Sequence, residues 1–72
     1  MELYPNPTND VLYVKNIPTP CSYKIYDMYG KVQSTGEVMD GNSLKTNNLQ
    51  SGTYLLVLEG NNVNYRRSFV KQ

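Results

Sequence analysis

The chain has 72 residues, and its 7 Lys and Arg against 6 Asp and Glu give a net charge of +1. A chain of this length forms one domain with a core near the lower size limit, and a charge this small supplies no long-range attraction to nucleic acid or to an anionic membrane. It has no histidine, and its single cysteine, Cys21, excludes an internal disulfide. We therefore expect no cofactor, no metal site and no nucleic-acid partner.

The first quarter of the chain predicts two strands. Residues 2–4 are short and apolar, and the prolines of Pro5-Asn6-Pro7 cannot donate ladder hydrogen bonds, so a short edge strand should end at a rigid corner. Residues 11–14 alternate, and we take the face that carries Leu12 and Val14 as buried.

Two hairpins are predicted after the proline-bearing loop at residues 16–20. The first has strands at residues 22–28 and 31–38 around a tight turn, in which Gly30 supplies a positive φ. Residues 43–47 then form a short fifth strand, and Leu49 fills the core beneath the following loop.

The most apolar part of the chain is the second hairpin, with strands at residues 54–58 and 63–70 and a Gly/Asn turn at residues 59–62. An apolar hairpin of this kind needs other strands to pack against. The remaining predicted strands supply them.

Seven short strands with turns every eight to twelve residues predict an all-β fold, a small Ig-like antiparallel β-sandwich that occupies residues 1–72. The five glycines and four prolines leave no interval for an amphipathic helix. The predicted core consists of apolar residues of matching parity: Leu3, Leu12, Val14, Tyr23, Ile25, Val32, Leu44, Leu49, Tyr54, Leu56, Leu58 and Phe69.

The polar residues do not predict catalysis. The six acidic residues are isolated, five of them in or beside predicted turns, where carboxylates cap backbone groups. No calcium-loop series, nucleophile and base pair, or paired carboxylates occur. We expect the chain not to be an enzyme.

The seven tyrosines allow two interpretations. On small sandwiches, tyrosines are commonly half-buried with the hydroxyl in water, and we favour this interpretation. The alternative is an exposed carbohydrate-binding patch formed by Tyr13, Tyr26, Tyr29 and Tyr65. Cys21 is interpreted as an inert small apolar residue, although an exposed loop thiol could dimerise the domain on oxidation.

Three of the seven basic residues lie in the last seven positions. Adjacent strand residues point to opposite faces, so Arg66 and Arg67 cannot form one patch. Protection of an edge strand by charge is the simpler explanation.

Short motifs along the whole chain resemble, in their order, the type A C-terminal sorting domain of the Por (type IX) secretion system of Bacteroidetes. The chain departs from the family pattern at two positions. Tyr23 stands where an aliphatic residue is usual, and Gln72 ends the chain after Lys71. The motifs are Leu3-Tyr4-Pro5-Asn6-Pro7, Leu12-Tyr13-Val14, the segment from Tyr23 to Val32, Leu49-Gln50-Ser51-Gly52-Thr53-Tyr54 and Ser68-Phe69-Val70-Lys71.

The resemblance implies a secretion signal at the C-terminus of a cargo protein. Such a domain directs its cargo from the periplasm through the outer-membrane translocon to a shuttle protein. A surface sortase then cuts upstream of Glu2 and joins the cargo to lipopolysaccharide, so we expect an excised part of a larger secreted protein. The sorting-motif residues would be Pro5, Asn6, Pro7, Gly30, Gly52, Tyr54 and Lys71.

We expect the last strand to be recognised by strand addition, with the Gly52-Thr53-Tyr54 corner and a basic tip beside it. The same strand could be exchanged between two copies of the isolated domain. The alternative function is a carbohydrate-binding or adhesion module. The proposed recognition edge comprises Tyr65, Arg66, Arg67, Ser68, Phe69, Val70 and Lys71.

Overall fold

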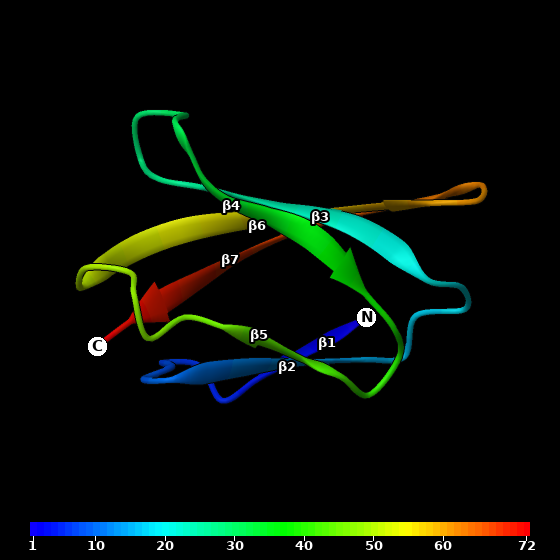
Figure 1. The fold of residues 1–72 in the computed structure, drawn as a ribbon, viewed down its shortest axis with the longest axis horizontal. Helices are drawn as coiled ribbons and strands as arrows, with labels where there is room; N and C mark the ends of the chain where they lie inside the picture. Colours follow the sequence, from blue (N-terminus) through cyan, green and yellow to red (C-terminus); the bar gives the residue numbers. More distant parts are fainter.

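The computed structural model describes residues 1–72, which form seven strands in two antiparallel layers (Figure 1). The predicted all-β sandwich is confirmed. The lower layer in Figure 1 has the strand order β1 (Glu2–Tyr4), β2 (Val11–Lys15), β5 (Ser43–Lys45). The upper layer has the order β4 (Val32–Val38), β3 (Cys21–Tyr26), β6 (Gly52–Gly60), β7 (Val63–Lys71).

The final hairpin is longer and its turn tighter than predicted. β6 and β7 have nine residues each, and Gly60 pairs with Val63. The turn is therefore reduced to two asparagines, of which Asn62 has a positive φ of 57°. Two-residue turns with positive φ match the twist of antiparallel strands. β6 lies between β3 and β7, whereas β7 is an edge strand.

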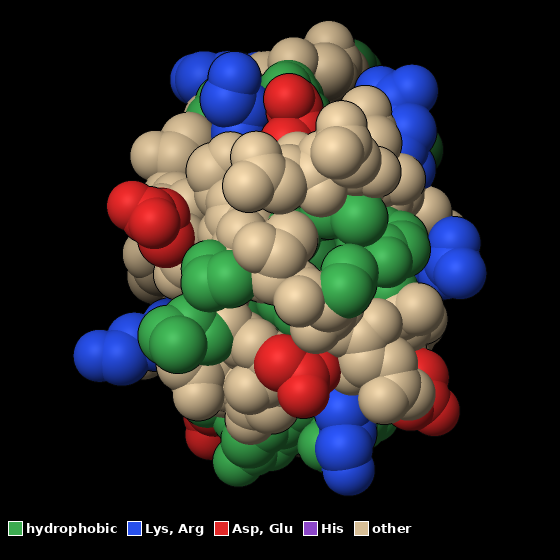
Figure 2. Space-filling model, turned by 90° about the vertical axis from the view of Figure 1, so that its right-hand side faces the viewer, with side chains coloured by type: hydrophobic (Ala, Val, Ile, Leu, Met, Phe, Trp, Pro, Cys, Tyr) green, Lys and Arg blue, Asp and Glu red, His purple; other side chains and the backbone are tan.

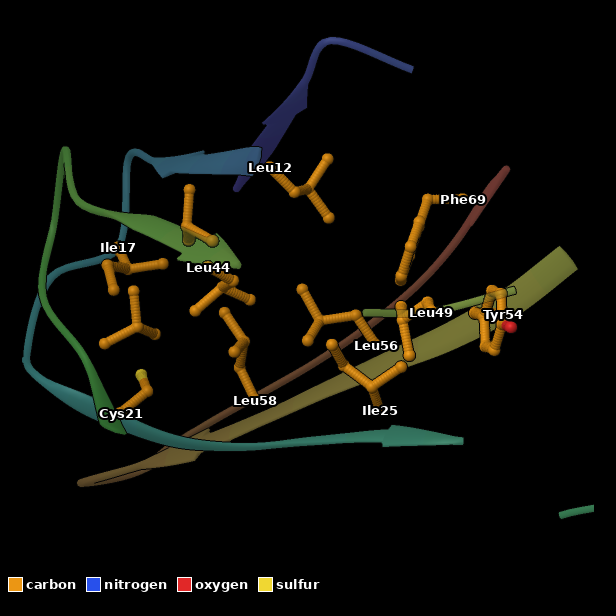
Figure 3. Packing of buried hydrophobic residues seen from close by; sticks show 12 residues of the cluster. Leu12, Ile17, Cys21, Ile25, Leu44, Leu49, Tyr54, Leu56, Leu58 and Phe69 are labelled. Atoms are coloured by element: carbon orange, nitrogen blue, oxygen red, sulfur yellow. The ribbon is translucent and has the colours of Figure 1, made fainter. Parts of the chain in front are cut away.

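The core lies between the two layers and is built by strand alternation (Figure 3). On β2, Leu12 and Val14 are fully buried, as the parity of the sequence predicted. Two predicted core residues, Leu3 and Tyr23, are partly buried and pack against the cluster. The predicted residues that are fully part of the core are Leu12, Val14, Ile25, Leu44, Leu49, Tyr54, Leu56, Leu58 and Phe69.

Val32 is the one predicted core residue that the structure places outside, with 43% of its surface exposed. The cause is a β-bulge: Ile25 pairs with Ser34 but Tyr26 pairs with Val32, so one extra residue interrupts the ladder. An extra residue reverses the parity of the strand beyond it. Val38, at the other end of the strand, is buried instead.

Ile17 and Cys21 are core residues that belong to a segment predicted to be a loop. The N–H of Ile17 donates to Asp40 Oδ1 at 3.1 Å, directly after Asn16 with its positive φ of 64°. Cys21 begins β3 opposite Val38 and is buried, so the exposed-thiol alternative is wrong. Burial raises the pKa of the Cys21 thiol, which keeps it protonated and unreactive.

A glycine makes room for the unusual Tyr23. Gly36 lies directly opposite Tyr23 on β4, and a Cβ at Gly36 would lie 2.8 Å from Tyr23 Cε2. A side chain at position 36 would therefore displace the ring. The aromatic residue at position 23 and the glycine at position 36 thus fit together.

Candidate functional site: the terminal strand and its cover

Two segments from opposite ends of the chain meet at one end of the sandwich. Thr8 forms a parallel bridge with Lys71. The Thr8 N–H donates to the Val70 carbonyl at 2.8 Å, and the Gln72 N–H donates to the Thr8 carbonyl at 2.9 Å. Asn6 Oδ1 accepts from the Val70 N–H at 2.9 Å. Residues 6–8 therefore cover the edge of β7 along residues 70–72.

A buried pair of threonines holds the covering segment in place. Thr8 and Thr46 are fully buried, and their Oγ1 atoms lie 3.2 Å apart. The Thr8 hydroxyl donates to the Val11 carbonyl, and the Thr46 hydroxyl donates to the Asn9 carbonyl at 3.3 Å. Every buried hydroxyl in this network has a partner, as buried polar groups require.

Tyr54 anchors the opposite side of β7. Its hydroxyl donates to the Gln50 carbonyl at 2.7 Å, which is the arrangement of a tyrosine corner. Its ring stacks on Phe69 with centroids 5.7 Å apart. Gly52, at the start of the same strand, pairs with Lys71. The Gly52-Thr53-Tyr54 corner is thus attached to the same stretch of β7 as residues 6–8.

The turn between β3 and β4 lies at the same end of the molecule (Figure 1). Asp27 Oδ1 accepts from the N–H groups of Tyr29 and Lys31, each at 2.9 Å, and Oδ2 accepts from Gln33 Nε2 at 2.8 Å. Gly30 has the predicted positive φ, 82°. The hydrogen bond from the Lys31 N–H, with the other two, lowers the pKa of the Asp27 carboxyl.

The backbone of β7 is uncovered over its first half. Both backbone groups of Val70 point away from β6, since they bond to residues 6–8. Backbone groups alternate between the two sides of a strand, so those of Asn64, Arg66 and Ser68 point outward as well. No other strand lies beside them. We call residues 64–68 the free edge.

Residues 2–72 match the family described as secretion system C-terminal sorting domain. The chain belongs to this family. It is thus a C-terminal sorting signal for type IX secretion, and its family is one of signals and not of enzymes. Membership implies export to the cell surface or the extracellular space, an upstream cargo domain and contact with the secretion machinery. No curated protein and no solved structure gives a significant match.

The sorting-motif residues, scattered along the sequence, gather at one end of this sorting domain. Asn6 contacts Val70, Gly52 pairs with Lys71, and the Gly30 turn lines the same hollow as Tyr54. The family resemblance identified these residues in the sequence, but it did not predict which residues they contact. Thr8, Thr46 and Gln72 were missed, because neither a threonine nor a glutamine carries a sign in the sequence that it will bond to a distant segment.

The proposed recognition edge divides in two. Arg66, Arg67 and Ser68 are exposed, and Tyr65 is half-buried against the core. Phe69 is in the core. Lys71 is only 9% exposed, so it does not form the basic tip that the sequence suggested. Its side chain has inward parity with Phe69, and residues 6–8 lie beside its backbone.

The four candidate tyrosines of the sorting domain do not form one platform. Tyr13 stacks on Tyr4 on the outer face of the three-stranded sheet, with centroids 5.3 Å apart. Tyr29 is 96% exposed at the β3–β4 turn, and Tyr26 is on β3. Tyr65 packs against the core. An aromatic sugar platform would need exposed rings side by side, and these rings lie on different surfaces.

Two other kinds of site are not found in the structure. No group of three or more Cys, Asp and Glu residues could hold a metal ion. No helix is long and apolar enough to cross a membrane.

The end of the molecule opposite the motif residues has cations and anions interspersed around it, with no large area of one sign (Figure 2).

Proposed function

We propose that the secretion machinery recognises this sorting domain by adding a strand to the free edge of β7. The observation that supports the proposal is the outward direction of the backbone groups of Asn64, Arg66 and Ser68, which have no strand beside them. Strand addition satisfies such groups with main-chain hydrogen bonds, while neighbouring side chains supply selectivity. Arg66 is exposed beside this edge and would contribute to that selectivity.

Residues 6–8 would set where the added strand stops. They already bond to both backbone groups of Val70 and to the Gln72 N–H. An incoming strand can therefore extend along β7 only as far as Ser68. The cover would also keep Phe69 and Lys71 in a fixed register, because it holds the backbone on either side of them.

Around this recognition step we propose the route of the family for the whole protein. Residues 1–72 act as the sorting part of a larger secreted protein, and the cargo passes through the translocon to the shuttle protein at the outer membrane. A surface sortase then removes the domain by cutting upstream of Glu2. The cargo is left on lipopolysaccharide or released into the medium. Family membership supports each of these steps.

Replacing Ser68 by proline tests the proposed edge. The Ser68 N–H points away from β6, so proline removes no hydrogen bond of the β6–β7 ladder but blocks an added strand. We expect secretion of a reporter fused to the domain to fall about tenfold, while the domain melts cooperatively. The control is Ser68→Ala, which keeps the N–H and should secrete normally. Normal secretion of a folded Ser68→Pro variant would show that the edge is not used.

We also propose that isolated copies exchange β7 to form a dimer. β7 has β6 as its only neighbouring strand, and its first half has no contact with residues 6–8. Exchange would preserve every β6–β7 pair while joining two molecules. Light scattering over a concentration series should detect the dimer. A monomer at every concentration would contradict this.

A further inference from the structure

The first half of β7 has a polar face and an apolar face. Tyr65 pairs with the core residue Leu58, so its side chain points toward the core. Val63 has the same parity, whereas the side chains of residues 64, 66 and 68 point to the outer face. Phe69, further along the inward face, is 1% exposed, but Val63 and Tyr65 are only half-buried. The apolar face beside the free edge is therefore incompletely covered.

The first strand supplies apolar residues on the same side of the sandwich. β1 is an edge of the three-stranded layer, and β7 is an edge of the four-stranded layer. Residues 6–8 follow β1 closely and are bonded to β7, so the two edges lie on one side. Leu3 pairs with the fully buried Val14 and points inward, yet Leu3 is half-buried, as is Met1. We call Met1, Leu3, Val63 and Tyr65 the open side.

The open side is a margin of the core. Its four residues all pack against the core cluster. Hydrophobic side chains are visible at the end of the molecule where β7 begins (Figure 2). A half-buried tyrosine alone can leave only its hydroxyl in water, but the side chains of Met1, Leu3 and Val63 have no hydroxyl, so the surface they expose is apolar. Apolar side chains placed against them would extend the core.

An occupant of the open side has to bring a backbone as well as apolar side chains. The outward backbone groups of residues 64, 66 and 68 run along it with no strand beside them. A helix or a sugar cannot pair with N–H and C=O groups spaced along a strand, whereas an extended segment pairs with all of them. Successive side chains of such a segment point to opposite faces. Every second side chain would therefore lie against the open side.

A second copy of the free edge is a poor occupant. If two free edges paired antiparallel over their full length, the two copies of the central residue, Arg66, would lie directly opposite each other. Like charges in that position destabilise a strand pair. Residues 64–68 include two arginines and no acidic residue that could compensate. The occupant is therefore a strand of different sequence.

We infer that the strand added to the free edge is amphipathic, and that its apolar side chains complete the core at the open side, against Leu3 and Tyr65. The inference rests on the proposed function and specifies the chemistry of its partner, an extended segment with an apolar residue at every second position. Leu3 and Tyr65 are then specificity-determining residues: they contact side chains of the added strand, while the free edge bonds to its backbone.

The test uses the 72-residue chain and two fluorescein-labelled peptides. The first, Asp-Val-Ser-Val-Thr-Val-Asp, is apolar at every second position. In the second, threonine replaces each valine, which keeps the β-branched shape and the strand propensity but adds hydroxyls. Fluorescence anisotropy should show that the valine peptide binds about tenfold more tightly. It should also change the amide signal of Ser68 and the methyl signals of Leu3.

Leu3→Thr should weaken binding of the valine peptide about fivefold and leave the threonine peptide unaffected. Leu3 pairs with β2 and not with β7, so this effect can pass only through side chains. The matched control is Tyr4→Thr, on the opposite face of β1, which should leave binding unchanged. Thermal melts establish that the variants are folded. Tyr65→Thr, and the comparison of the two peptides on the unmodified chain, keep the test valid if Leu3→Thr is not.

The Ser68→Pro variant separates failure of the inference from failure of the proposed function. Equal binding of the two peptides that is lost in folded Ser68→Pro would overturn the inference and leave the edge in place. A preference for the valine peptide that persists in this variant would contradict the edge, and the inference with it.

Three further results would overturn the inference. They are no binding of either peptide, an equal loss in Tyr4→Thr, or signal changes that omit both Leu3 and Tyr65. If neither peptide binds, secretion of the reporter with Ser68→Pro still decides the proposed function. Sedimentation that shows the unmodified chain self-associating through Leu3 and Tyr65 would assign the open side to a second copy.

Discussion

The two halves of β7 pair with the same strand but differ in what lies on their other side. Residues 64–68 have β6 on one side and no strand on the other. Residues 69–71 have β6 on one side and residues 6–8 on the other, and their inward side chains, Phe69 and Lys71, are buried. One half is therefore available for pairing, and the other is fixed.

This difference separates stability from recognition along a single strand. A sorting signal must be folded when it is recognised, yet it must leave some backbone unpaired for a partner. β7 meets both needs with different residues: the free edge leaves backbone groups unpaired, and the following residues are held by residues 6–8. Changes in its fixed half should then reduce the free energy of unfolding, whereas changes in the free edge should reduce secretion and leave folding nearly intact.

The largest effect is expected from Phe69→Ala. Phe69 is 1% exposed and stacks on Tyr54, so truncation leaves a large cavity that costs about 3–5 kcal/mol. For a domain of this size, much of the total stability would be lost. Urea denaturation followed by circular dichroism measures the change. Ser68→Ala, one residue away, should change stability by less than about 0.5 kcal/mol. Similar losses in the two variants would contradict the division of β7.

Thr8→Val is expected to come next. The substitution keeps the shape of a fully buried side chain but removes the hydroxyl that donates to Val11 and contacts Thr46. We expect a loss of about 1–3 kcal/mol, because the Val11 carbonyl and the Thr46 hydroxyl each lose a partner. Thr35→Val, at an exposed position of β4, is the matched control and should be nearly neutral. If the control is equally destabilised, the threonine pair does not hold the cover in place.

Asn6→Ala tests the cover directly and should cost about 0.5–1.5 kcal/mol, since the Val70 N–H loses its acceptor. Amide hydrogen exchange gives the sharper measurement. In the unmodified chain, the Val70 amide should exchange slowly and the Ser68 amide quickly, although both point away from β6. In Asn6→Ala, the Val70 amide should become as fast as that of Ser68. Equal rates in the unmodified chain would show that residues 6–8 do not protect the strand.

The sequence predicted the strands well because alternation indicates which face is buried. Leu12 and Val14 on β2 follow this rule, as do Leu56 and Leu58 on β6. It fails at Val32, where a single bulge residue reverses the parity. A bulge has no side-chain signature in this strand, so counting alone could not locate it.

The candidate site was only partly predictable for a different reason. Alternation shows which way a side chain points but not which segment lies beside a strand. The contact between Asn6 and Val70 joins residues 64 positions apart. The family resemblance identified both segments, but it did not predict their contact. The free edge ends at residue 68 because residues 6–8 cover the strand beyond it. The apolar run at residues 54–58 predicts a strand, but it does not show that Leu55 and Val57 face away from the core.

The smallest expected effect concerns Asp27 at the β3–β4 turn, which is outside β7 and tests how local the fixed region is. Asp27→Asn keeps the geometry of the turn but removes the charge that strengthens its hydrogen bonds. The pKa of this carboxyl is lowered in the fold from an ordinary value of 3.8, so its stabilising contribution is present above pH 3.8 and is lost as the pH falls through the lowered pKa. A melting difference that persists in acid would show that the charge of Asp27 is not the cause, and faster exchange at Val70 would extend the fixed region to the turn.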